Sequence, residues 1–177
     1  MKIRTIVEKA SEVLGIAPDF NATTGATATL VKCANAVIEE LTLSVVSLRD
    51  VAKATASGGR ITYESLGRNV REITDVIDAH GDRAEYVRYP DYIFVARDGL
   101  YAVKLCYYLC NLGVMEEFSL PPEYSEGVLV YGVLSEYYYR TGLIDEAIFY
   151  RNRFDRMATG VSNVRSAPRT VRARRLL

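Results

Sequence analysis

The sequence contains no apolar run that approaches the roughly 20 residues a membrane-spanning helix requires. Its first residues also lack the uninterrupted apolar stretch of a secretory signal, because Glu8 and Glu12 interrupt the pattern there. These absences predict a protein that is made in the cytoplasm and does not enter a membrane. With 49% hydrophobic and 25% charged residues, the 177-residue chain has the composition of one globular domain with or without a tail.

Residues that ligate metals or form disulfides are scarce. The chain has 3 cysteines, Cys33, Cys106 and Cys110, in no zinc-ligand spacing, and its 1 histidine cannot complete a Cys/His site. We expect the cysteines to be reduced and to pack as small hydrophobic residues. The sequence therefore predicts no metal and no cofactor.

Common catalytic motifs are absent as well, including G-x-S-x-G, H-E-x-x-H and the Walker pattern. His80 has Asp75, Asp78 and Asp82 near it in sequence, where a general base is conceivable, but polar residues of this kind are common in turns between strands. We therefore predict no catalytic residues. An enzyme would need a concave site with perturbed carboxylates near His80.

No acidic residue follows Asp155. The 22 basic and 22 acidic residues cancel overall, but the arginines after Asp155 give residues 156–177 a charge of +6 and leave 0 − 6 = −6 for residues 1–155. Such an end is either solvated or an arm that binds an acidic surface or nucleic acid. Because it lacks aromatic residues for stacking on bases, any DNA contact would be with phosphates.

Helical periodicity dominates both ends of the chain. Apolar residues from Ile3 to Leu14 lie on one helical face, and Gly15 stands where a left-handed cap is expected. Later, Pro121 and Pro122 suit the first turn of a helix that Gly142 ends. The patterns predict helices at residues 2–15, 27–53, 121–141 and 144–158, the last two forming an αα-hairpin. On the last helix, one face is predicted to hold Ile144, Ala147, Ile148, Arg151 and Phe154.

Between these helices, the composition changes to that of strands. Gly58-Gly59 is predicted to end the second helix as a linker, and residues 60–108 are rich in Val, Ile, Thr and Tyr. Turn signals at residues 80–82, 90–91 and 98–99 separate the apolar segments, with Asp98-Gly99 the strongest hairpin signal. They predict a short strand or turn at residues 60–63 and a small antiparallel meander with strands at residues 71–77, 84–89, 92–96 and 101–107.

The sequence thus predicts an α+β protein: a mainly helical bundle with an inserted β-meander and an extended tail. One domain would span residues 1–159, and a basic carboxy-terminal arm would span residues 160–177. All 13 tyrosines fall between residues 63 and 150. Three consecutive tyrosines, Tyr137 to Tyr139, spread over about 200° of a helix, so at least one is expected to face solvent or a partner.

Three segments of the chain resemble the adaptor, or head-to-tail connector, proteins of tailed bacteriophages, including the tail tubular protein A type. They are KIRTIVEKASEVLGI at residues 2–16, ITDVIDAHGDRAEYVRYPDYIFV at residues 73–95 and LPPEYSEGVLVYGVLSEYYYRTGLIDEAIFYRNRF at residues 120–154. The third is the most specific, since its double proline, tyrosine-rich helix end and Gly turn resemble the family's carboxy-terminal hairpin. One segment departs from the family pattern: CYYLCNLGV at residues 106–114 replaces a proline-containing strand end.

The resemblance implies a non-enzymatic structural virion protein, made in the host cytoplasm, that forms a ring around the DNA channel. Such rings typically contain twelve copies and lie beneath the portal. The helices would form the ring, the strands would point toward a distal tail or nozzle protein, and non-specific contact with packaged DNA is possible. A portal-binding arm would comprise Arg165, Arg169, Arg172, Arg174 and Arg175, and subunit contacts would come from Tyr124, Tyr131, Tyr138, Tyr139 and Tyr150.

Two other readings of the sequence remain open. The arm's acidic target can equally be a neighbouring copy rather than the portal. Alternatively, the chain is a small cytoplasmic adaptor whose carboxy-terminal helices resemble a single tetratricopeptide unit and bind a cellular peptide. That adaptor would be a stable monomer indifferent to loss of the arm.

Overall fold

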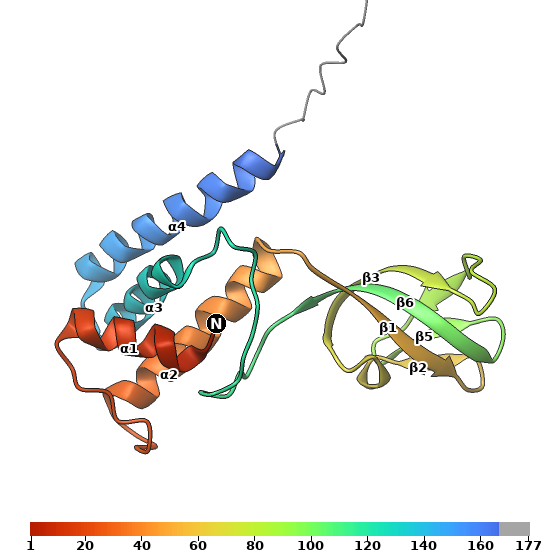
Figure 1. Cartoon of the computed structure of the whole chain (residues 1–177), viewed down its shortest axis with the longest axis horizontal. Coiled ribbons are helices and arrows are strands. Elements are labelled where there is room, and N and C mark those ends of the chain that lie inside the picture. Colours follow the sequence, from red (N-terminus) through yellow and green to blue (C-terminus); the bar gives the residue numbers. More distant parts are fainter. Residues whose placement is uncertain (167–177) are drawn as a thin grey trace, which may run out of the picture.

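The computed structural model describes the backbone of residues 1–166 and the side chains of residues 1–158. This part of the chain is α+β, as predicted, with helices at one end and two small antiparallel sheets at the other (Figure 1). The elements are α1 Ile3–Leu14, α2 Ala26–Ser44, β1 Leu48–Ala56, β2 Arg60–Thr62, the 3₁₀ turn η1 Glu64–Leu66, β3 Asn69–Ile77, β4 Tyr86–Arg88, β5 Tyr92–Val95, β6 Gly99–Tyr108, α3 Glu126–Thr141 and α4 Ile144–Ser166.

The helices share one hydrophobic core. On α1, the predicted face is buried at Ile3, Ile6 and Val7, and Gly15 caps the helix in the left-handed conformation with φ +67°. Helix α3 lies at the centre and packs against α1, α2 and α4. Its buried residues include Gly132, where an added Cβ would meet side chains of both α2 and α4.

Helix α3 begins later than predicted. Its amino-terminal cap is Ser125, and Pro121 and Pro122 lie in the segment before it, where the amide of Tyr124 donates to the carbonyl of Pro121 at 2.9 Å. That turn reverses the chain and delays the helix until Glu126, whose carboxylate suits the positive end of the helix dipole.

The prediction of helix to residue 53 was wrong. Helix α2 ends at Ser44, and residues 48–56 form strand β1, which pairs along its whole length with β6 from Leu48 opposite Tyr107 to Ala56 opposite Gly99. The apolar residues of this segment fit a helical period, but the partner that makes it a strand is some 50 residues away. Local periodicity cannot show such a long-range pairing.

The strands do not form the predicted meander. One sheet has the order β1-β6-β3 and the other β2-β5-β4, so of the consecutive strands only β4 and β5 pair within one sheet. The turn at residues 98–99 connects strands of different sheets. Gly58 and Gly59 form a tight reversal between β1 and β2, with φ +57° and +70° and two hydrogen bonds of 3.1 Å between Ser57 and Arg60.

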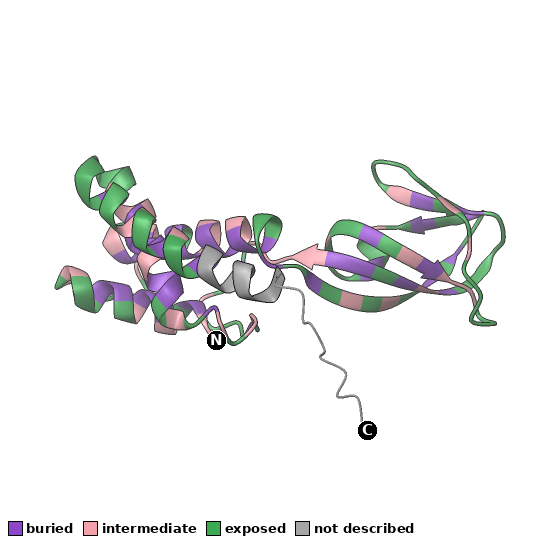
Figure 2. Cartoon of the chain, turned by 90° about the horizontal axis from the view of Figure 1, so that it is seen from above, coloured by how far each residue is buried: buried purple, intermediate pink, exposed green. Residues whose placement is uncertain are grey.

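The two sheets enclose a second core, separate from that of the helices. Its residues include Ile61, Ile93 and Val95 from one sheet and Val76 and Leu105 from the other. Burial alternates along the strands, as expected when one face of each sheet points inward (Figure 2).

Side chains continue the contact between the sheets where β3 and β4 diverge. The hydroxyl of Tyr86 donates to the carbonyl of Ile73 at 3.1 Å, and the guanidinium of Arg88 donates to the same carbonyl. A backbone hydrogen bond between β3 and the segment that leads into β4 is made at Val76, whose carbonyl accepts from the amide of Ala84 at 2.8 Å. These polar contacts satisfy part of an otherwise open sheet edge.

Helix α4 continues to Ser166, although its predicted end was residue 158 and an extended arm was expected from residue 160. Of the predicted arm residues, Arg165 lies on this helix, and its side chain is outside the described part. The others, Arg169, Arg172, Arg174 and Arg175, lie outside the described residues.

Replacing Gly132 with alanine is expected to lower the free energy of unfolding by about 1–3 kcal/mol, because the new methyl group would overpack the core. Its Cβ would lie 2.7 Å from Val37 and 3.1 Å from two ring atoms of Phe154, both buried. The matched control is Gly127→Ala, whose Cβ would meet nothing closer than Ser125 at 3.8 Å. Urea denaturation followed by circular dichroism compares the two; equal stability would contradict the close helix approach.

Candidate functional site

The turn around His80 shows no geometry suited to catalysis. The carboxylate of Asp78 accepts hydrogen bonds from the amides of His80 at 2.8 Å and Asp82 at 3.0 Å. The bond from Asp82 is the largest cause of a lowered pKa for Asp78. The carboxylate therefore stabilises an exposed turn. Within residues 1–158, no group of three His, Cys, Asp or Glu side chains is placed to hold a metal ion.

The cysteines are free thiols. Cys33 and Cys106 are buried, whereas Cys110 is partly exposed. Burial raises the pKa of Cys33 to about 11, and burial also raises the pKa of Cys110. A raised pKa leaves little thiolate at neutral pH, so Cys33 and Cys110 are weak nucleophiles.

A thiol reagent such as Ellman's reagent at pH 8 is expected to modify Cys110 first in the folded protein. Cys33 and Cys106 should react only as the protein unfolds, because both are buried and the thiolate of Cys33 is scarce. The variant Cys110→Ser should lose the single fast phase. Two fast-reacting thiols in the folded protein would contradict the described packing.

The predicted contact tyrosines occupy three different environments. Tyr124 is only 2% exposed and packs in the helical core, so we remove it from the set available to another subunit. Tyr150 of α4 stacks on Tyr131 and Tyr138 of α3, with ring centroids 6.2 and 5.5 Å apart. Tyr139 is the opposite case, since 67% of it is exposed.

The Tyr150 stack holds α4 against α3. All three rings are half-buried, and the guanidinium of Arg153 lies 4.9 Å from the centre of the Tyr131 ring. Desolvation, followed by the neighbouring Tyr150, raises the pKa of the Tyr138 phenol, which therefore stays neutral. These tyrosines join the two helices of one chain and remain partly exposed at its surface.

An open groove of about 430 Å³ lies beside Tyr139, between α3 and α4. We call it the α3–α4 groove. Ile144 and Ile148 line it and are 47% and 54% exposed, whereas Ala147 and Phe154, which were predicted on the same helical face, are buried. The complete lining is Ser135, Glu136, Tyr139, Ile144, Ala147, Ile148 and Arg151.

Two polar contacts fix the shape of the groove. At its floor, the hydroxyl of Ser135 donates to the carbonyl of Ala147 at 3.0 Å. At its side, the guanidinium of Arg151 holds both carboxylate oxygens of Glu40 on α2, at 3.0 and 2.6 Å. This pairing, with a further contact to Asp155, raises the pKa of Arg151, so α4 is tied to α2 as well as to α3.

The variant Arg151→Lys is expected to lose about 0.5–1 kcal/mol of stability, because a lysine keeps the charge but cannot bind both oxygens of Glu40. Both side chains are partly exposed, which limits the effect. Arg140→Lys is the control, since Arg140 approaches Glu136 with a single contact of 3.8 Å. Thermal unfolding at low and high salt compares the two variants. Equal decreases in melting temperature would contradict a larger contribution to stability from the Arg151–Glu40 pair.

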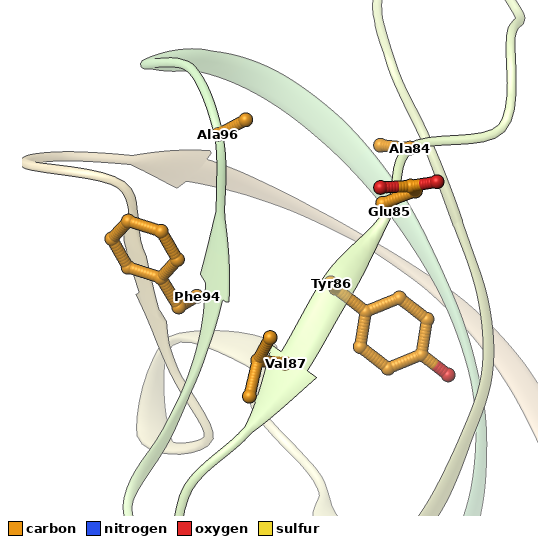
Figure 3. A pocket seen from close by; sticks show the side chains of 6 residues that line it. All are labelled: Ala84, Glu85, Tyr86, Val87, Phe94 and Ala96. Atoms are coloured by element: carbon orange, nitrogen blue, oxygen red, sulfur yellow. The ribbon is translucent and has the colours of Figure 1, made fainter.

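A second hollow, of about 480 Å³, lies on the two sheets formed by strands β1 to β6, which we call the strand unit (Figure 3). Val87 of β4 and Phe94 of β5 are opposite one another in the sheet and lie on its outer face, 55% and 42% exposed. Glu85 is the one acidic side chain of the lining, which otherwise consists of Ala84, Tyr86, Val87, Phe94 and Ala96. Such an apolar lining offers contact area and no reaction chemistry.

Compared with known proteins, the chain matches no family model, and no curated protein shows significant similarity to it. Within the part of the chain that the structure describes, no helix is both long enough and apolar enough to span a membrane. The exposed apolar side chains of the α3–α4 groove were missed by sequence reasoning. A 3.6-residue period indicates that Ile144 and Ile148 share a face, but it does not say whether another helix covers that face.

Proposed function

We propose that this protein is a ring-forming head-to-tail connector of a tailed bacteriophage, in which the helices contact neighbouring copies beneath a portal. The observation that carries the proposal is the apolar surface at the start of α4. Leu143, Ile144, Ile148 and Phe149 are each about half exposed, and Tyr139 stands beside them. Apolar and aromatic side chains gathered on one surface are typical of protein contacts.

The position of α4 supports a contact between copies. It packs mainly on α3, and Leu143, Ile144, Ile148 and Phe149 at its start stay exposed for a partner. A non-enzymatic role is consistent with the explained turn at Asp78 and with the raised pKa of Cys33. The resemblance noted in the sequence supplies the class of protein, and the exposed surface supplies a place for the contact.

The strand unit suits a second partner. It extends away from the helices (Figure 1), and its outer face carries the hollow at Val87 and Phe94. We assign this face to the distal tail or nozzle protein. The arginine-rich arm would meet an acidic surface, on the portal or on a neighbouring copy, and packaged DNA would be touched only through phosphates.

The second candidate function, a monomeric adaptor that binds a cellular peptide, rests on the same α3–α4 groove. A groove of about 430 Å³ between two helices can accept a short apolar segment. That adaptor would stay monomeric with or without a portal, and loss of the arm would leave its peptide affinity unchanged.

Ring assembly tests the proposal. Mixed with the portal protein encoded near it, the full chain is expected to form rings visible by electron microscopy, and Ile148→Asp should abolish them because a charge would be buried in the contact. The matched control is Val13→Asp on α1, an exposed helical residue of similar accessibility at 55%. A chain that forms no ring on the portal, or rings that persist in Ile148→Asp, would contradict the proposal.

A further inference from the structure

The α3–α4 groove has acidic margins around its apolar lining. Glu136 lies in the groove, and Asp145 is on the adjoining surface of α4, where it neighbours Ile148 and Phe149 at helical spacings of three and four. Asp145 is exposed and forms no ion pair with a described residue. It is therefore available to a cation from outside.

Counting the whole margin leaves a net negative charge. The carboxylates are Glu40, Glu136, Asp145, Glu146 and Asp155, and the cations are Arg140, Arg151 and Arg153, which gives 3 − 5 = −2. All three cations are already engaged, Arg151 by Glu40 and Asp155, Arg140 by Glu136, and Arg153 over the rings of Tyr131 and Phe149. The groove thus presents exposed apolar side chains beside surplus negative charge.

Residues 169–175, with the sequence RTVRARR, complement this groove. They carry four arginines and no acid, with Val171 and Ala173 between them. Arginine side chains can lay their apolar stems over Ile148 and Tyr139 while their guanidiniums pair with carboxylates or lie over the Tyr139 ring.

The geometry of α4 prevents this segment from filling the groove of its own chain. The groove is at the first turns of α4 and the segment follows its last residue, Ser166, about 27 Å along the helix from Ile148. Fully extended, the chain covers about 10 Å from Ser166 to Arg169 and about 20 Å to Arg172. Arg169 and Arg172 therefore fall short of Ile148, and Arg174 and Arg175, at about 26 and 30 Å, could approach it only with the chain fully extended back along α4. The segment as a whole cannot fill the groove of its own chain, so a second molecule must supply it.

We propose that the α3–α4 groove of one copy binds the arginine-rich segment, residues 169–175, of a second copy. The inference rests on the proposed ring and identifies one of its contacts. Because the groove is at the first turns of α4 and the segment follows the helix in sequence, each copy would donate its segment to one neighbour and receive the segment of another. Such a head-to-tail contact repeats around a closed ring, and high salt should weaken it.

Charge reversal in full-length chains tests this contact. The groove variant carries Glu136→Arg and Asp145→Arg, and the arm variant carries Arg172→Glu, Arg174→Glu and Arg175→Glu. Each alone is expected to associate at least tenfold more weakly than the original chain in sedimentation velocity at low salt, because like charges would meet. A 1:1 mixture should recover association, since each arm then meets a groove of opposite charge.

Circular dichroism checks that both variants are folded. The single change Asp145→Arg, at an exposed residue that has no ion pair with a described residue, provides a milder groove variant. A mixture that fails to recover association, or an arm variant that associates like the original chain, would overturn the inference. If the arm variant still forms rings but no longer binds the portal, the arm contacts the portal and the connector function stands. If the original chain forms no ring even with portal, the proposed connector function is contradicted, and the inference that rests on it is contradicted with it.

Discussion

The structure depends on the close packing of α3 at the centre of the helical unit. Gly132 lets α3 approach Val37 of α2 and Phe154 of α4 at distances that a methyl group would prevent. With α3 in the centre, α1 and α2 cover two of its sides and α4 covers another. Nothing in the described part of the chain lies beyond α4. Its outer surface is therefore left open as a direct result of helix order.

That arrangement explains which parts of the site could be predicted from sequence. The face of α1 was correct from Ile3 to Ala10 and the left-handed cap at Gly15 was correct, because a helix with one apolar stripe needs only local information, although Val13 at the end of that stripe is exposed. On α4, the same reasoning grouped Ile144 and Ile148 on one face with Ala147 and Phe154, but only Ala147 and Phe154 are buried. Helix α4 has apolar residues on more of its circumference than its neighbours can cover, and only tertiary packing decides which of them stay exposed.

The strand region shows the same limit in another form. Composition and turn residues located most of the strands to within a few positions, and the reversal at residues 90–91 between β4 and β5 was correct. Pairing was not predictable, because β6 joins β1 and β3 across long stretches of chain. Gly58-Gly59 was read as the end of a helix, although two glycines between strands are also a common hairpin turn. Because residues 48–53 were predicted as helix, β1 was not recognised, and the hairpin turn after it was not recognised either.

The two cores are joined through few contacts, and Thr42 in the last turns of α2 takes part in several of them. Its hydroxyl donates to the carbonyl of Ile38 at 2.8 Å and accepts from the amide of Leu109 at 3.1 Å, and its carbonyl accepts from Arg71 on β3 at 3.3 Å. The buried Thr42 thus contacts both Leu109, which directly follows β6, and β3. A mechanical pull on the tip of the strand unit would reach α2 at this residue. Movement of the strands relative to the helices would therefore strain the hydrogen bonds of Thr42 to Arg71 and Leu109.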